Sequence, residues 1–572
     1  MRRRRRVEAG RSGGWRPRLT TTGIVATLLF LFVASYRFNT LGGALGGFDN
    51  DHFLHFALAK QVEAGEQPLR DFLDGGLQGA RPSLTYELSA LAQRLMGDNL
   101  RSEALLNVLG VATAATVTFV AATHVAPWPV ALVTAVLAAL LSPKLYGYPK
   151  VLVLAVACLL ILKYARTPGW WLVAAMSLWT AVGFLFRHDY SVYCGLGSVM
   201  ALALAGPPIW WKRVARVCAY AAVTIVLLTP SLYWVQQSSG LAAYVRNGVE
   251  MGRRDAQRTT LRWPVPAISV TESPAANFER EENSQAWLYY TFLTLAWAVP
   301  VTALVRLRRN LSGDPRDVPM LAIGAMTALL SLFFLRGSLE ARFGDMGPPL
   351  AIVASWVMVL SVEGSHRPLL RRAATGALAV AVLGMTAAAI WALQGVRTEL
   401  DRAGLRTSPA AVVLQAARIW IELGGLPGGS RGPDVASPSG RSAYYLHECT
   451  RPDDRVLVVS YAPEVEGLSG RLFAGGRASF VPGFYEDERY SRFLLERLRA
   501  QSVPLVLAEE EPYYVSFPGL ADYLRQTYEE RGRIEIDGGK WLRVLAHKAW
   551  NARSFGPDGL PCFDPSVVRV GG

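Results

Sequence analysis

Residues Thr22–Tyr36 read TGIVATLLFLFVASY, an apolar segment without a charged side chain. The preceding residues 1–18, MRRRRRVEAGRSGGWRPR, hold eight arginines and one acid. Further apolar runs follow along the 572 residues, of which 51% are hydrophobic and 18% charged. Several of them approach or exceed the roughly 18 residues typical of a membrane-spanning helix. This composition excludes a disordered chain, a fibrous repeat and a disulfide-stapled miniprotein, and it predicts a polytopic α-helical membrane protein.

Apolar runs separated by charged, Pro or Gly breaks predict about eleven spans within a transmembrane domain of residues 22–395. The predicted spans are Thr22–Tyr36, Ala104–Thr123, Trp128–Leu141, Val151–Leu162, Trp170–Phe186, Tyr190–Trp211, Val214–Val235, Ala286–Val305, Val318–Leu335, Pro348–Val362 and Ala373–Leu393. The third and fourth are short for a bilayer core about 30 Å thick, so they borrow flanking residues or end partway and line a cavity.

The positions of Lys and Arg predict the orientation. The basic tail, residues 1–21, is interpreted as a cytoplasmic anchor that faces anionic membrane lipid; nucleic acid is not expected as a partner. Most of the other turns expected on that side also carry basic residues. Eleven spans then place everything after Leu393 outside, together with two large loops, residues 37–103 and 236–285.

The chain beyond the last span divides into a connecting segment, residues 396–440, and a predicted extracytoplasmic α/β domain, residues 441–572. Buried strands are expected at Arg455–Ser460, Pro504–Ala508 and Trp541–His547, and helices at Arg489–Ala500 and Leu520–Glu529. Cys449 and Cys562 fall at opposite ends of this domain, where oxidation is permitted, and either form a disulfide or stay as two thiols.

The first outside loop contains GGFDNDHFLHFALAKQVEAGEQPLRDFLDGGLQGARPSLTYELSALAQRLMGDN. Asp49 and Asp51 stand immediately before an amphipathic stretch, Phe53–Val62. A carboxylate at a membrane surface is commonly solvated, and Asp49 could simply cap a helix. The functional interpretation gains from Arg81, which precedes a proline and an aromatic and aliphatic helix. His52 and His55 have no partners at metal-ligand spacing and are interpreted as surface or structural residues.

The order of these motifs resembles the GT-C superfamily of membrane glycosyltransferases, which use sugars linked to polyprenyl phosphates. The features are D-x-D-x-F, a helix ending in E-A-G-E-Q-P, then R-D-F and G-A-R-P-S-L-T-Y, and a helix ending in M-G-D-N. The order is similar to that of protein O-mannosyltransferases and lipid A aminoarabinose transferases. This resemblance implies that Asp51, or its competitor Asp49, is the catalytic base and that Arg81 contacts the lipid phosphate. The family commonly has Asp-Glu where this chain has Asp-Asn-Asp, so the base stays open between the two residues.

The chemistry of such a donor suits these residue types. An inverting transfer needs a base that takes a proton from the acceptor, which a carboxylate can do. The leaving phosphate gains negative charge, and cations directed at it stabilise the transition state. Further outward cations are Lys150, Arg187 in the motif FRHDY, and Arg336 and Arg342 before the tenth span. The alternatives are snorkelling at the headgroups and a structural pair of Arg187 with Asp189.

No cofactor is required for this reaction, and no residues have convincing metal-ligand spacing, although the Asp-Asn-Asp motif could contribute to a divalent-cation site. We therefore predict a glycosyltransferase of a bacterial cytoplasmic membrane that moves a sugar from a polyprenyl-phosphate donor to a lipid, glycan or protein acceptor on the outer face. The alternatives are a transporter or flippase for a lipid-linked sugar, which would favour charges inside spans, and a non-catalytic cell-envelope assembly protein. The sugar and the acceptor cannot be read from the sequence.

Overall fold

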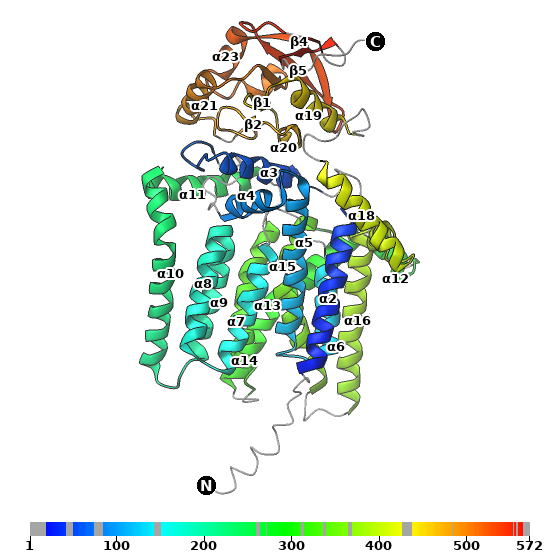
Figure 1. The fold of residues 1–572 in the computed structure, drawn as a ribbon. Coiled ribbons are helices and arrows are strands. Elements are labelled where there is room, and N and C mark those ends of the chain that lie inside the picture. Colours follow the sequence, from blue (N-terminus) through cyan, green and yellow to red (C-terminus); the bar gives the residue numbers. More distant parts are fainter. Residues whose placement is uncertain are drawn as a thin grey trace.

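The computed structural model describes residues 19–41, 48, 50–73, 84–141, 150–238, 240–258, 263–269, 271–309, 314–335, 339–363, 369–425, 437–483, 485–552, 554–555 and 559–563. These residues form a helical bundle, a layer of helices that lies across one end of it, and a sheet-containing region beyond that layer (Figure 1). Helix α2 begins at the opposite end of the bundle from the sheet.

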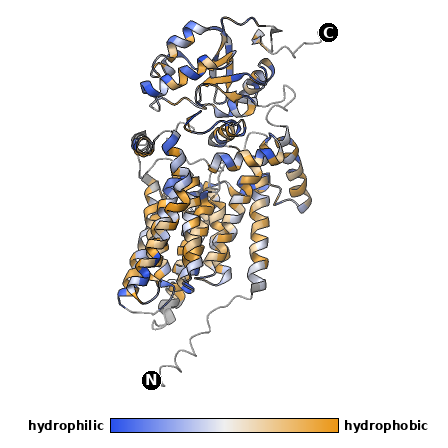
Figure 2. Ribbon diagram, turned by 60° about the vertical axis from the view of Figure 1, so that its left-hand side comes forward, coloured by the Kyte–Doolittle hydropathy of each residue, from blue (hydrophilic) through white to orange (hydrophobic). Residues whose placement is uncertain are grey.

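The predicted spans each overlap a helix of the bundle. Its helices are α2 (Leu19–Asn39), α5 (Leu100–Ala122), α6 (Trp128–Leu140), α7 (Lys150–Arg166), α8 (Trp170–Phe186), α9 (His188–Leu204), α10 (Trp210–Ser238), α13 (Glu281–Arg308), α14 (Asp317–Leu330), α15 (Leu339–Glu363) and α16 (Leu369–Leu393). Within the described part of the chain, six helices are long and apolar enough to cross a membrane, and shorter apolar helices accompany them. Hydrophobic residues dominate the bundle (Figure 2). The chain is thus a polytopic membrane protein, while the number of crossings stays a prediction.

Several predicted boundaries are wrong. The predicted sixth span, Tyr190–Trp211, runs too far because α9 already ends at Leu204. The predicted ninth span ends in a short 3-10 helix, η1 (Ser331–Leu335), rather than in a continuous α-helix. The short fourth span borrows flanking residues at both ends and becomes the 17-residue α7. Apolarity alone did not mark the ends of the sixth and ninth spans, because the residues beyond them are apolar too. Helix α7 instead continues through Lys163 and Arg166, whose charges had ended the predicted span.

Two glycines let bundle helices pack closely. A Cβ at Gly324 of α14 would lie 2.9 Å from Cδ of Pro300, which sits inside α13. A Cβ at Gly347 of α15 would lie 3.2 Å from the carbonyl oxygen of Ala138 in α6. Small residues at such crossings allow the backbone approach that van der Waals packing between membrane helices requires. The second crossing fixes the start of α15 against α6.

The layer across the bundle end comes mainly from the two predicted loops. It contains α3 (Asn50–Glu63), α4 (Leu84–Met96), α11 (Leu241–Arg258), α12 (Pro274–Glu279) and α18 (Pro409–Gly424) (Figure 1). The short α17 (Val396–Arg402) precedes α18, so the predicted connecting segment contains helices. These helices separate the bundle from the sheet region.

The C-terminal region holds a five-stranded sheet in the order β2-β1-β3-β5-β4. Its strands are β1 (Arg455–Val459), β2 (Leu472–Phe473), β3 (Leu505–Ala508), β4 (Tyr528–Ile536) and β5 (Lys540–His547). Strand β1 pairs in parallel with β2 and β3, whereas β5 pairs antiparallel with β3 and β4. The predicted helix Leu520–Glu529 was too long: α23 ends at Thr527, and β4 follows at once.

Both faces of this sheet are covered because its central strands are apolar on both sides. Val456 and Val458 pack in one cluster with α19 (Pro438–Cys449) and α20 (Pro463–Ser469). Leu457 and Val459 pack in the other with α21 (Glu488–Ala500) and α23 (Leu520–Thr527). The short α22 (Glu511–Tyr514) joins β3 to α23. Alternate strand residues point to opposite faces, so the result is a three-layer α/β arrangement.

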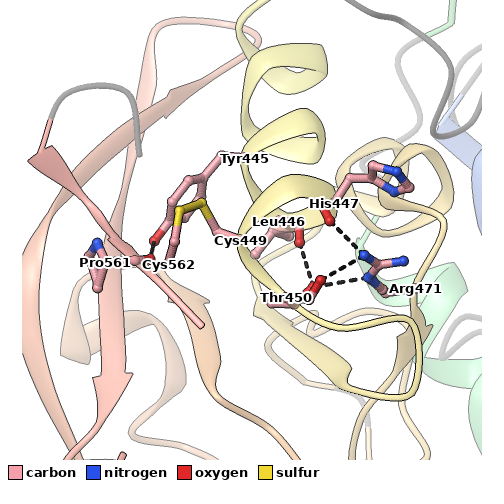
Figure 3. The surroundings of a disulfide bond; sticks show 8 residues. All are labelled: Tyr445, Leu446, His447, Cys449, Thr450, Arg471, Pro561 and Cys562. Carbon is pink, nitrogen blue, oxygen red and sulfur yellow. Dashed lines mark hydrogen bonds between the residues drawn. A yellow bond between two sulfur atoms is a disulfide. The ribbon is translucent and has the colours of Figure 1, made fainter. Parts of the chain in front are cut away.

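A disulfide joins Cys449 at the end of α19 to Cys562 in β7 (Pro561–Cys562), which pairs with β6 (Ser554–Phe555) (Figure 3). Around it, the Tyr445 hydroxyl donates to the Pro561 carbonyl at 2.8 Å, and the Phe563 N–H donates to the Cys449 carbonyl at 2.8 Å. The alternative that the sequence left open is thereby decided in favour of the disulfide.

The sheet region is fastened to the layer beneath it by charged and backbone contacts. Oε1 of Glu66, just after α3, accepts from Arg455 Nη2 at 2.7 Å and Arg497 Nη2 at 2.9 Å. The Leu73 N–H donates to the Gly476 carbonyl at 2.8 Å. Helix α20 lies on the start of α3, where a Cβ at Gly467 would meet the Phe53 carbonyl at 3.3 Å. Helix α3, which carries Asp51, is therefore packed against the sheet region through α20.

Candidate active site

The first turn of α3 carries Asp51, at the end of the bundle that faces the sheet region. Three other predicted site residues, Asp49, Arg81 and Arg336, lie outside the described residues. The structure therefore locates the predicted base only through the helix that bears it, and it leaves the choice between Asp51 and Asp49 open.

Lys150 is the first residue of α7, and its ammonium group is buried. Its Nζ lies 2.6 Å from Oδ1 of Asp345 in α15, with side-chain exposures of 2% and 0%. Desolvating two charges costs several kcal/mol per ion, and their mutual attraction only partly offsets that cost. Buried charge at the end of a membrane helix is a pointer to function.

Arg342 lies about one turn before Asp345 in α15 and faces the same carboxylate. Its Nη1 lies 3.8 Å from Oδ2 of Asp345, and its side chain is 20% exposed. The two oxygens of Asp345 thus face two different cations. Arg342 also interacts electrostatically with Lys150, which it repels.

Arg187 lies at the junction of α8 and α9 and interacts electrostatically with Lys150. Its extended backbone ends α8 and starts α9, so the apolar helices break at this one residue. Its Nε donates to Asp189 at 2.8 and 3.0 Å, the structural pair that the sequence left as an alternative, and its guanidinium lies 5.0 Å from the Tyr190 ring centroid. The side chain is 7% exposed, and it acts electrostatically on Lys150.

We call Lys150, Arg187 and Arg342 the cation group. Three separate elements bring them together: the start of α7, the α8–α9 junction and the start of α15. These three helix ends lie at the end of the bundle that adjoins α3 (Figure 1). Asp345 pairs with Lys150 and Arg342, and Asp189 pairs with Arg187; that these cations share a phosphate with Arg81 and Arg336 stays a prediction.

A buried polar network follows directly after Asp51. His52, 1% exposed, has its Nε2 2.8 Å from Asn107 Nδ2 and 3.6 Å from Oε2 of Glu103 in α5. Glu103 is fully buried and also accepts from the Ser89 hydroxyl of α4. Of the two interpretations of His52 and His55, the structural one holds, since both are buried. Glu103 was missed because its side-chain partners, His52 and Ser89, lie on two other helices, α3 and α4.

An apolar cavity of about 360 Å³ lies between α6, α13, α15 and α16. The hydroxyls of Ser361 and Thr386 in its wall donate to carbonyls of their own helices, at 2.7 and 2.8 Å, and Thr375 donates to the Ser361 carbonyl at 2.8 Å. The wall therefore offers hydrocarbon to an occupant. Gly347, two residues after Asp345 in α15, lines it, so the cavity begins close to the cation group.

No group of three or more His, Cys, Asp or Glu residues that could hold a metal ion occurs in the part of the chain that the structure describes. What the described residues do provide is positive charge beside an apolar cavity. Such an arrangement can bind an anionic headgroup and stabilise negative charge that develops on it.

Comparisons with known proteins give likenesses of fold. No family model and no curated protein matches the sequence. The structure is similar to that of ArnT from Cupriavidus metallidurans bound to undecaprenyl phosphate, with a TM-score of 0.48 and 13% identity, covering 94% of this chain and 99% of that one. It is also similar to the oligosaccharyltransferase AglB from Archaeoglobus fulgidus, in complex with an inhibitory peptide and a dolichol-phosphate, with a TM-score of 0.40 and 11% identity, covering 92% of this chain and 74% of that one. Both neighbours are GT-C superfamily members. At these identities the likeness concerns the fold alone.

Proposed function

We propose that this chain is a glycosyltransferase that moves a sugar from a polyprenyl-phosphate donor to a lipid, glycan or protein acceptor. The observation that carries the proposal is the cation group, whose buried Lys150 and Arg187 lie at one end of a membrane bundle. In the proposed orientation this end of the bundle lies at the membrane surface, where lipid phosphates lie, and arginine and lysine are the residues that bind phosphate. In the proposed complex Arg81 and Arg336 join the cation group around the phosphate.

The apolar cavity supports a lipid-linked donor. It offers a hydrocarbon wall within two residues of Asp345, so one molecule can place an isoprenoid chain at bilayer depth and its phosphate at the cation group. A soluble nucleotide sugar would leave that cavity unused. The cation group and the apolar cavity lie next to each other, and together they support a donor with a phosphate and a hydrocarbon chain.

In the proposed reaction, Asp51 or Asp49 takes the proton of the acceptor hydroxyl while the acceptor oxygen forms a bond to the anomeric carbon of the sugar. The bond from that carbon to the phosphate oxygen breaks with inversion. The cation group stabilises the charge that the phosphate gains. No metal ion or cofactor takes part in this scheme.

We place the site on the outer face of a bacterial cytoplasmic membrane, with the N-terminus inside. The disulfide supports this orientation, because disulfides persist in oxidising compartments and are rare in the cytosol. The start of α2 lies at the opposite end of the bundle from the disulfide-bonded region. The sheet region, held over α3, would help to position the acceptor.

The test uses Asp51→Asn and Asp49→Asn separately, in membranes supplied with radiolabelled polyprenyl-phosphate sugars. One variant should lose transfer of label while it accumulates like the wild type. Asp401→Asn, at an exposed acid of α17 paired with Arg406, is the matched control and should transfer normally. If both variants retain full transfer, neither residue is the base. Movement of labelled lipid across vesicles without transfer would instead indicate a flippase.

A further inference from the structure

The proposed reaction, on which this inference rests, changes the charge of the lipid that the cation group holds. The donor is a phosphodiester with a single ionisable oxygen. When the sugar leaves, the bonding electron pair stays on the phosphate oxygen, and the acceptor proton goes to the base. The lipid product is a phosphomonoester, which carries about −1.5 to −2 charges near pH 7. Cations arranged to hold the donor therefore hold the product more tightly.

Asp345 stands where it can counter this effect. It is fully buried, its Oδ1 is 2.6 Å from Lys150 Nζ, and its Oδ2 is 3.8 Å from Arg342 Nη1. A carboxylate that spreads its two oxygens over two cations occupies them as two phosphate oxygens would. It is thus an anion built into a site for anions.

The same acid also joins two of the three cations, Lys150 and Arg342. Arg187 and Arg342 repel Lys150, whereas Asp345 attracts it. The buried Lys150 and the partly exposed Arg342 need such a counter-charge before the donor arrives. An ordinary structural pair is seen at the other end of the bundle, where buried Asp317 faces Arg306 at 2.9 Å.

We propose that Asp345 is a positioning residue that preassembles the cation group and repels the polyprenyl-phosphate product. Coulomb energy is proportional to the charge on each partner. A product with nearly two negative charges is therefore repelled by Asp345 about twice as strongly as a donor with one. Asp345 thereby biases the site toward the donor and speeds product release.

The test compares two lipids that differ in this charge and does not require the natural sugar. Undecaprenyl phosphate stands for the product, and its methyl phosphodiester stands for the donor. Their dissociation constants are measured on the purified full chain in detergent, for the wild type and for Asp345→Asn. We expect Asp345→Asn to tighten binding of the monoester about tenfold more than binding of the diester, or about 1.4 kcal/mol of selectivity.

Two further variants make the measurement specific. Asp317→Asn removes a buried, arginine-paired acid at the far end of the bundle and should leave the ratio of the two constants unchanged. Asp345→Glu keeps the charge and should return the ratio toward the wild-type value. If Asp345 only held α7 against α15, Asp345→Asn would weaken binding of both lipids by the same factor.

If Asp345→Asn does not accumulate as folded protein, Asp345→Ser also removes the charge and should shift the ratio in the same direction. An unchanged ratio in an Asp345 variant that folds overturns the role of Asp345 but leaves the proposed function standing. Failure of the wild type to bind either lipid overturns the proposed function itself.

Discussion

The disulfide between Cys449 and Cys562 closes a long loop, and its removal is the perturbation with the best-defined magnitude. The two residues are 113 positions apart. The chain-entropy relation for a loop of that length gives about 5 kcal/mol at 25 °C, and native disulfides in small domains typically contribute about 2–5 kcal/mol. Cys449→Ser should therefore lower the free energy of unfolding of the sheet region by an amount in this range.

Hydrogen–deuterium exchange of β3 measures this change in the full chain. Residues Leu505–Ala508 pair with β1 on one side and β5 on the other, so their amides exchange only when the sheet opens. A loss of about 2–5 kcal/mol raises their exchange rate by about thirtyfold to about four-thousandfold. Cys218→Ser, at an exposed cysteine of α10, is the control and should change nothing. Exchange within about threefold of the wild type, or free thiols at both positions in never-reduced protein, would refute the reasoning.

Three other changes probe separate contacts of the molecule. Glu66→Gln removes the charge that Arg455 and Arg497 share, and it should weaken docking of the sheet region onto the layer of helices by about 1.5–3 kcal/mol. The Leu73 amide, which donates to the Gly476 carbonyl, should then exchange about tenfold to a hundredfold faster. Unchanged exchange would show that the Glu66 contact does not hold the sheet region on that layer. Burial holds the pKa of Glu466 well above its usual value of 4.5, so the stability that the protonated form contributes is complete below pH 4.5 and is lost as the pH rises toward the folded-state pKa. Glu466→Gln should consequently raise the Tm of the sheet region at about pH 7.5 but not at about pH 4, and an equal rise at both would contradict the assignment. Lys150→Gln should lower kcat for transfer by about a hundredfold or more, a prediction that near-normal turnover in accumulating protein would rule out.

The helices of the bundle were predictable because burial in hydrocarbon depends on local composition. An apolar run such as Thr22–Tyr36 has one stable conformation in a membrane, since a helix satisfies its backbone hydrogen bonds internally. The buried strands β1 and β3 lie close to their predicted ranges for a similar reason: both of their faces are apolar. Strand β4 was missed because it is a largely exposed edge strand whose sequence, YEERGRIEI, continues the pattern of the preceding helix.

For the site, the sequence supplied candidate cations but not their geometry. Lys150, Arg187 and Arg342 could be singled out because each interrupts or borders an apolar run, where a charge is costly. The contacts of Asp345 with Lys150 and Arg342 could not be predicted in the same way. Its partner Lys150 belongs to a different helix far away in the chain, and no local pattern links the two.

The sequence by itself determined that this chain enters a membrane, roughly where the helices of its bundle lie, and which charges stand at helix ends. It did not determine every boundary: the predicted tenth span, Pro348–Val362, begins well inside α15 (Leu339–Glu363). These properties follow from the transfer of short segments between water and hydrocarbon, which each segment undergoes with little help from the rest. Only the tertiary structure decided that Asp345 lies between Lys150 and Arg342, that Cys449 meets Cys562, and that Glu66 joins two arginines of the sheet region. Such contacts depend on how closely the helices pack at their small residues and on which elements the loops bring next to one another. Both are properties of the whole molecule.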